Sequence, residues 1–138
     1  MISLSDYWMG RDSDYPLAMS PQIERNAAQL LELVNKLLVV ANTAGIRAAM
    51  NSRGTVVRSG WRPPAVNAAT HGAAFNSKHM TGQAIDLEDP TGALGKWLFA
   101  NVPVLRDIGI WCEHPRATPS WVHCQSMPPA SGNRFFLP

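Results

Sequence analysis

Between Ser20 and Gly45 the chain carries one long amphipathic pattern, and a protein of this size has to build its core around it. Ser20 suits the N-cap of a helix, Pro21 suits the first helical position, and Gly45 can end the helix. The pattern therefore predicts one long helix with a single apolar face. That face comprises Ile23, Ala27, Leu30, Leu31, Val34, Leu37, Leu38 and Ala41.

Four shorter segments after this helix have the character of strands, at residues 54–60, 83–89, 107–113 and 120–126. The last two are joined by "HPRATP" and read as a strand pair, and residues 91–105 read as a short helix. A helix followed by short strands is typical of the α+β class. We expect a small antiparallel sheet with one long N-terminal helix and a short second helix, in a single domain spanning residues 1–138.

Composition excludes several classes of function. The 138 residues carry a net charge of +2, which is too small to indicate a nucleic-acid binder. No apolar run reaches the length of a membrane span, and the N-terminus lacks the basic and apolar regions of a signal peptide. Two cysteines, Cys112 and Cys124, are too few for a disulfide framework, so we expect reduced thiols in a monomer made in the cytoplasm.

His79 and Asp86 stand seven positions apart in "SKHMTGQAIDL", with Gly82 between them. One helix would separate them by about 10 Å along its axis, and an extended strand would separate them further. Two ligands of one zinc ion need donor atoms only about 3–3.5 Å apart. If both bind one metal, the chain has to reverse between them, and Gly82 is suited to that turn. Asp86 would then lie on a strand, facing away from the core.

His123 in "SWVHCQ" offers a third ligand on a later strand. Side chains alternate along a strand, so Trp121, His123 and Gln125 share one face and Cys124 lies on the other. Two histidines and one carboxylate, with a fourth position left for water, are typical of a catalytic zinc site. A structural zinc site would more often have four protein ligands rich in cysteine.

The segments "SGWRPP", "SKHMTGQAIDL" and "WVHCQ" together resemble one group of zinc peptidases, the M15-like peptidases. This group includes the D-alanyl-D-alanine carboxypeptidases, related phage endolysins and the hedgehog signalling domain. The resemblance extends from Val56 to Gln125, and the ending "PPASGNRFFLP" resembles small phage or prophage members. It implies the fold of that group and a zinc ion bound by His79, Asp86 and His123.

The resemblance also implies roles for other residues. Arg62 would pair with a substrate carboxylate, and Ser77 would support the site through the substrate or by orienting a ligand. The group needs an acid/base carboxylate near the last histidine. The position three residues before it, common in the simplest relatives, is Ser120 here. Glu113, across the "HPRATP" turn, is the candidate base, and His114 is its rival.

The implied activity is metal-assisted hydrolysis of peptidoglycan stem peptides, by a carboxypeptidase or an endolysin-type endopeptidase. Arg62 favours a substrate with a free carboxyl end, but the bond itself stays open. Such an enzyme would act on the cell wall, in the periplasm after release or as part of a virion. The alternative is a non-catalytic, zinc-stabilised structural or binding module of a phage virion. A carboxylate or histidine within reach of the site's water distinguishes the two.

Overall fold

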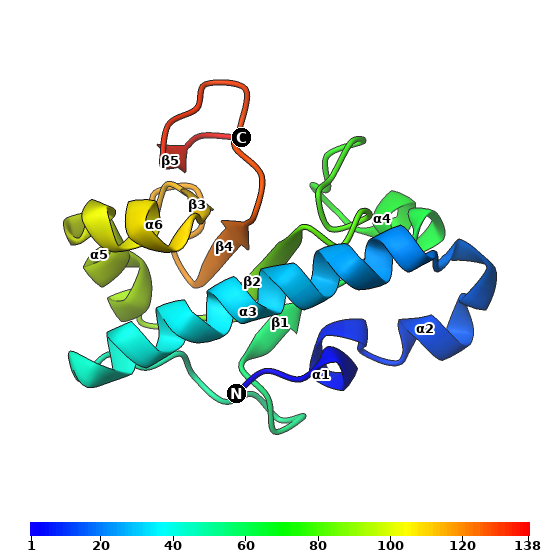
Figure 1. The fold of residues 1–138 in the computed structure, drawn as a ribbon, viewed down its shortest axis with the longest axis horizontal. Helices are drawn as coiled ribbons and strands as arrows, with labels where there is room; N and C mark the ends of the chain where they lie inside the picture. Colours follow the sequence, from blue (N-terminus) through cyan, green and yellow to red (C-terminus); the bar gives the residue numbers. More distant parts are fainter.

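A long helix lies across a five-stranded sheet in the computed structural model, which describes all 138 residues (Figure 1). None of the helices combines the length and the apolar character that crossing a membrane would require. In chain order the elements are α1 (Leu4–Trp8), α2 (Arg11–Asp14), the 3-10 helix η1 (Pro16–Ala18), α3 (Pro21–Thr43), β1 (Val57–Ser59), α4 (Pro64–Ala69), β2 (Ala84–Glu88), α5 (Ala93–Ala100), α6 (Val102–Ile108), β3 (Trp111–Glu113), β4 (Trp121–Gln125) and β5 (Phe135–Phe136).

Helix α3 forms where the amphipathic pattern predicts it. The Ser20 hydroxyl caps the helix by accepting a hydrogen bond from the Ile23 backbone N–H at 3.2 Å, and Pro21 occupies the first turn. The helix ends at Thr43, just before Gly45. Its buried residues all belong to the predicted apolar face: Ala27, Leu30, Leu31, Val34, Leu37 and Ala41.

The strands are ordered β1-β2-β4-β3-β5, so the two strands that carry Asp86 and His123 are central neighbours. The pairs β1–β2, β2–β4 and β3–β4 are antiparallel, as predicted, and β5 adds a parallel pair with β3. The α+β class with a long N-terminal helix and a small sheet is confirmed. The sheet is mixed because the C-terminal segment returns alongside β3.

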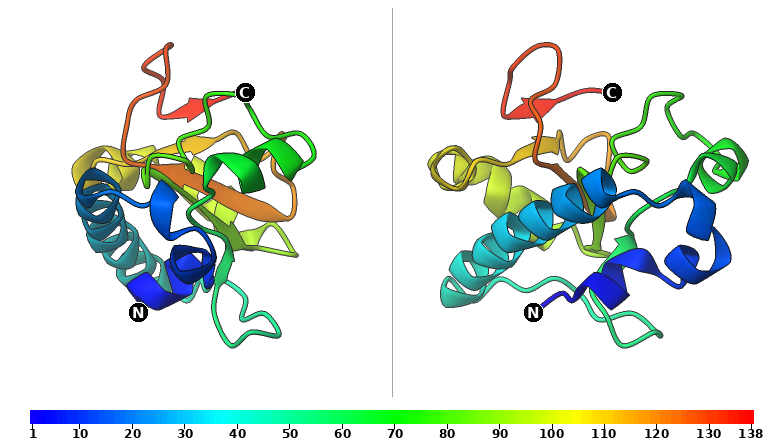
Figure 2. Two further views of the ribbon diagram at one scale, coloured as in Figure 1. Left: turned by 90° about the vertical axis from the view of Figure 1, so that its right-hand side faces the viewer. Right: turned by 45° about the vertical axis from the view of Figure 1, so that its right-hand side comes forward.

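The two faces of the sheet have different environments. Ile85 and Leu87 of β2 and Val122 and Cys124 of β4 are buried in one hydrophobic core with the apolar faces of α3, α5 and α6. Figure 2 shows α3, α5 and α6 grouped beside this face of the sheet. Asp86 and His123 lie between these core residues along their strands and so point to the opposite face. We call this second face the site face.

The structure differs from the sequence prediction in four places. Segment 91–105 forms two helices, α5 and α6, which meet at Asn101. Helix α6 continues to Ile108, so only Trp111–Glu113 of the predicted strand 107–113 forms β3. The long segment after β1 contains the short helix α4, which the sequence analysis did not predict. The residues before Ser20, for which no element was predicted, form α1, α2 and η1.

Candidate metal centre

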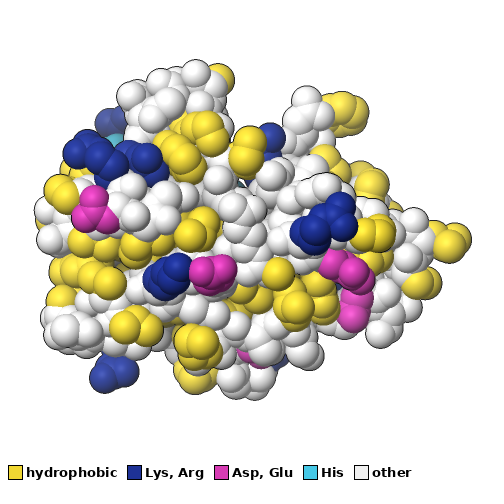
Figure 3. Space-filling model, in the orientation of Figure 1, with side chains coloured by type: hydrophobic (Ala, Val, Ile, Leu, Met, Phe, Trp, Pro, Cys, Tyr) yellow, Lys and Arg dark blue, Asp and Glu magenta, His cyan; other side chains and the backbone are white.

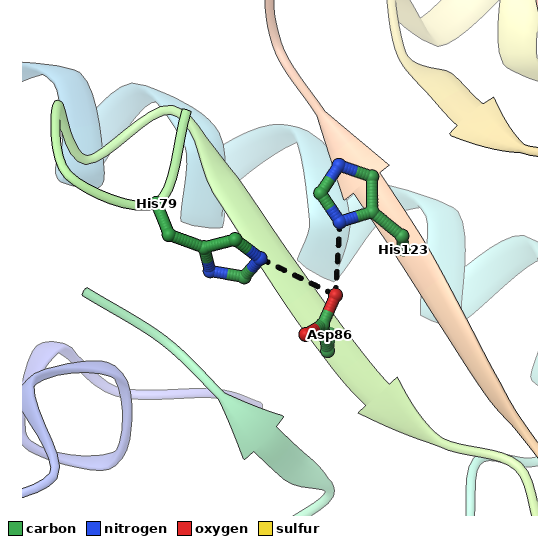
Figure 4. A group of neighbouring side chains, drawn as sticks. All are labelled: His79, Asp86 and His123. Atoms are coloured by element: carbon green, nitrogen blue, oxygen red, sulfur yellow. Dashed lines mark hydrogen bonds and ion pairs between the residues drawn. The ribbon is translucent and has the colours of Figure 1, made fainter. Parts of the chain in front are cut away.

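The side chains of His79, Asp86 and His123 converge on one point of the site face (Figure 4). One ligand atom from each residue lies within 4.8 Å of the other two. The Asp86 Oδ1 atom lies 3.3 Å from His79 Nε2 and 2.9 Å from His123 Nδ1. These residues come from the turn before β2, from β2 and from β4, so tertiary folding builds the cluster.

Gly82 allows the chain reversal that brings His79 back over β2. Its φ of +75° is strained for other residues, and an added Cβ would lie 2.8 Å from the Ile23 carbonyl oxygen of α3. The Asn26 side-chain amide, also on α3, donates to the Thr81 carbonyl at 2.8 Å. The N-terminal end of α3 therefore holds the turn in place.

Two further hydrogen bonds fix the orientation of His79. The Ser77 hydroxyl accepts from the His79 backbone N–H at 3.2 Å. His79 Nδ1 lies 2.8 Å from the Gly60 carbonyl oxygen, which can only accept, so Nδ1 carries the proton and donates. The Nε2 lone pair is consequently free and points at the cluster. Gly60 itself has no room for a side chain, because a Cβ there would meet the Tyr7 carbonyl oxygen at 1.9 Å.

Sheet register places two residues of the cluster, Asp86 and His123, within one row across the sheet. Asp86 pairs with Ser59 of β1 on one side and with His123 of β4 on the other. Trp111 pairs with Gln125 and Cys112 with Cys124, and the next step of this register sets Glu113 opposite His123. The row Ser59, Asp86, His123 and Glu113 crosses four strands on the site face.

The surroundings of the cluster shift the pKa values of its two histidines in opposite directions. Burial lowers the pKa of His79, and this effect outweighs the opposing attraction of the Asp86 charge. Burial therefore favours the neutral form of His79. Burial also acts against the charge on His123, but the hydrogen bond to Asp86 prevails and raises its pKa to about 9. Burial disfavours ionised Asp86, yet the neighbouring His79 and His123 lower its pKa overall.

The donor set fits a divalent metal ion. His79 is only 1% exposed, and its Nε2 is buried without a hydrogen-bond partner, an arrangement that a metal ion would satisfy. Two imidazoles and one carboxylate are ligands that zinc accepts, and the Gly60 carbonyl supplies the outer hydrogen bond that metal-binding histidines commonly make. The Cys124 thiol lies on the core face, 3.6 Å from the Cys112 sulfur, and both thiols are free.

Arg62 lies beside the cluster, just after β1. Its backbone N–H donates to the His79 carbonyl at 3.1 Å, and its side chain is largely buried with Nε unpartnered. Burial lowers the pKa of Arg62, an effect that the charges of Asp86 and Glu113 oppose. This guanidinium is therefore directed into the same region as the carboxylates.

Glu113 and His114, the two candidate bases, point to opposite faces of the sheet. The Glu113 carboxyl is half-buried on the site face; burial raises its pKa, and the charges of His123 and Arg62 offset this in part. The ring of His114 instead packs 4.7 Å from that of Phe99 on α5, and its Nδ1 accepts from the Arg116 backbone N–H at 3.0 Å. This geometry favours Glu113 as the base.

Three residues at the cluster had no assigned role in the sequence analysis. Gln125 shares a face with His123, and its Oε1 lies 3.2 Å from His123 Nε2. Gly60 contributes only its carbonyl oxygen. The rings of Phe136 and His123 form a T-shaped pair, with ring centroids 6.2 Å apart and planes at 88°. Strand alternation indicated the position of Gln125, whereas no local signal indicated Gly60 or Phe136.

The cluster lies between two projecting segments. His79 follows the loop after α4, and Phe136 belongs to the C-terminal segment; in Figure 1 these segments rise side by side with a gap between them. The space-filling view in the same orientation shows a notch there (Figure 3). Ring contacts link the two sides through His123, which lies 5.2 Å from His79 and 6.2 Å from Phe136 between centroids. A ligand that enters the notch therefore approaches the cluster.

Comparison with known proteins gives one match. The sequence model of the family described as Peptidase M15 matches residues 19–125, which include all three residues of the cluster together with Arg62, Ser77 and Glu113. Searches of curated proteins and of solved structures found no match.

Proposed function

Because the chain belongs to the peptidase M15 family, we propose that it is a zinc-dependent peptidase that cleaves peptidoglycan stem peptides. His79, Asp86 and His123 hold the metal ion in this proposal. The observation that carries it is the convergence of these three ligand atoms within 4.8 Å, with His79 Nε2 buried and unpartnered. The substrate class and the metal's identity derive from the sequence resemblance and the donor chemistry.

A bound zinc ion would supply a Lewis acid that activates water and polarises the scissile carbonyl. The side chains of the protein transfer the protons and position the reactants. Glu113 accepts a proton from the attacking water and returns it to the leaving amine, as a general base and then a general acid. Its raised pKa suits both steps, because such a carboxyl can exchange protons closer to neutral pH.

Arg62 and Ser77 position the reactants. The Arg62 guanidinium pairs with the terminal carboxylate of the peptide, which a planar fork of donors can hold bidentately. Ser77 keeps His79 oriented through its backbone N–H. A free carboxyl end on the substrate favours carboxypeptidase action at a D-Ala-D-Ala bond over endopeptidase action within the stem.

Digestion of purified peptidoglycan tests this function. Protein loaded with zinc should release stem-peptide fragments or terminal alanine, identified by mass, and a chelator should abolish release until zinc is added back. Catalytically inactive protein that still binds the peptides would favour the alternative, a zinc-stabilised binding module of a virion. Glu113 on the site face favours the enzyme, because a binding module needs no acid/base group there.

The place of action follows from the substrate. Peptidoglycan lies outside the cytoplasm, so in this proposal the protein acts on the cell wall, either in the periplasm after release from the cell or as part of a phage particle. Detection of the protein in purified particles or in lysate alone would distinguish these routes.

A further inference from the structure

The C-terminal segment, residues 126–138, lies beyond the region matched by the peptidase family, yet it reaches the metal centre. It leaves β4, loops outward and returns as β5, which closes one edge of the sheet (Figure 1). The family match ends at Gln125, just before this segment begins.

Specific contacts hold the segment in place. The Cys112 backbone N–H donates to the Arg134 carbonyl at 2.8 Å, and the His114 N–H donates to the Phe136 carbonyl at 2.8 Å. The Arg134 guanidinium lies 4.1 Å from the centre of the Trp111 ring and donates to the Ile110 carbonyl at 3.1 Å. The segment is therefore tied to β3 by its backbone and by a cation–π contact.

Phe135 and Phe136 project to opposite sides of β5 and serve different purposes. Phe135 packs edge-on against Phe99 of α5 at 5.1 Å, on the core face. Phe136 pairs in register with Glu113 and extends the row of site residues to the fifth strand. Its half-buried ring touches His123 and leaves part of its surface accessible. Packing in the core explains the position of Phe135. Phe136 instead lies next to the metal centre.

We propose that Phe136 is a specificity-determining residue of the peptidase, forming an apolar wall that contacts the substrate side chain next to the scissile bond. This inference rests on the proposed function and adds the chemistry of one subsite. Arg62 follows β1 at the far end of the row, whereas Phe136 lies on β5 at the other. The bound peptide thus lies across the strands, with its carboxylate toward Arg62 and an apolar group, such as a methyl, against Phe136.

The test compares Phe136→Ala and Phe136→Leu with a matched control, Leu137→Ala. Leu137 is the next residue, is 55% exposed and has no part in the site. Each protein is loaded with zinc, and its zinc content and melting temperature are measured. Hydrolysis kinetics use soluble disaccharide-peptides released from peptidoglycan by a muramidase. Binding of the purified product peptides is measured by calorimetry, which gives a readout independent of turnover.

Phe136→Ala should raise KM and the product Kd about tenfold, with kcat changed by less than about threefold, because it removes ring contact common to substrate and product. Phe136→Leu should recover most of this loss, and Leu137→Ala should match wild type. All variants should keep one zinc per chain.

Unchanged KM and Kd in an active Phe136→Ala protein would overturn the inference and leave the proposed function standing. A parallel loss of zinc and kcat would also overturn it, since Phe136 would then only support His123. If zinc-loaded wild type neither cleaves nor binds the fragments, the proposed function fails and the inference fails with it.

Discussion

Replacing Glu113 with glutamine removes one proton acceptor from the site face and keeps its shape. We expect kcat to fall by about 10²–10⁴, the usual effect of removing a positioned acid/base group. This corresponds to about 3–5 kcal/mol of activation free energy. We expect this whole decrease in kcat because no other carboxylate can replace Glu113 as the base. Asp86 is bonded to the histidines, and Glu88 is paired with Arg58 at 3.5 Å.

The pH dependence of Glu113→Gln gives a second readout. Burial raises the pKa of Glu113, so the acidic limb of wild-type kcat/KM should lie above the ordinary range of a glutamate, and the variant should lack that limb. The raised pKa also means that the folded state holds this proton to a higher pH than the unfolded chain. The contribution of Glu113 to stability therefore falls as pH rises through this interval, and above it the variant should melt at a higher temperature than wild type.

Steady-state kinetics on soluble peptidoglycan fragments, with zinc content determined on the same samples, provide the assay. The variant should bind one zinc per chain and keep KM close to wild type, because Glu113 is neither a ligand nor a substrate anchor. Full turnover by zinc-loaded Glu113→Gln would refute its role as the base. His114 could not take over this role, because its ring packs against Phe99 and away from the cluster. Neither of the two predicted candidates, Glu113 and His114, would then remain as the base.

Three other substitutions test separate parts of the account. Arg62→Ala should raise KM most for peptides with a free carboxyl end, by about 10-fold or more, whereas Arg58→Ala should not; equal effects of the two in kinetic assays would contradict the anchoring role. Cys124→Ala should keep full zinc occupancy by elemental analysis, because the thiol faces the core, and a folded variant without zinc would show that the facing is wrong. Gly60→Ala should destabilise the fold by about 3 kcal/mol in denaturant titration, since its Cβ would clash with the Tyr7 carbonyl at 1.9 Å; an unchanged midpoint would exclude this tight approach.

Local patterns were sufficient to predict the elements with strong periodicity. Helix α3 follows from its apolar face and from the Ser20 cap, and β2 and β4 follow from short apolar runs. Strand alternation also predicted that His123 and Cys124 point to different faces, which agrees with the free thiol pair in the core. The turn at Gly82 follows from its sequence and from the distance that a shared metal imposes.

Tertiary contacts determine the parts that the sequence did not predict. Strand β5 has only two residues, Phe135 and Phe136, and exists because β3 offers it a parallel partner. The sequence left Glu113 and His114 as rival candidates for the base, and the pairing of β3 with β4, which no local pattern specifies, decides that Glu113 faces the cluster. The orientation of His79 depends on the Gly60 carbonyl, nineteen positions earlier in the chain. Such pairings are set by packing across distant segments, so they become visible only in three dimensions.

Titration of metal-free protein with zinc tests the central claim most directly. Protein stripped by a chelator is given increasing zinc, and hydrolysis of peptidoglycan fragments is measured at each step. We predict no activity without metal, a linear rise, and a plateau at one zinc per chain, with His123→Ala inactive throughout. Activity in the stripped protein, or saturation with zinc without any hydrolysis, would contradict a peptidase built on His79, Asp86 and His123.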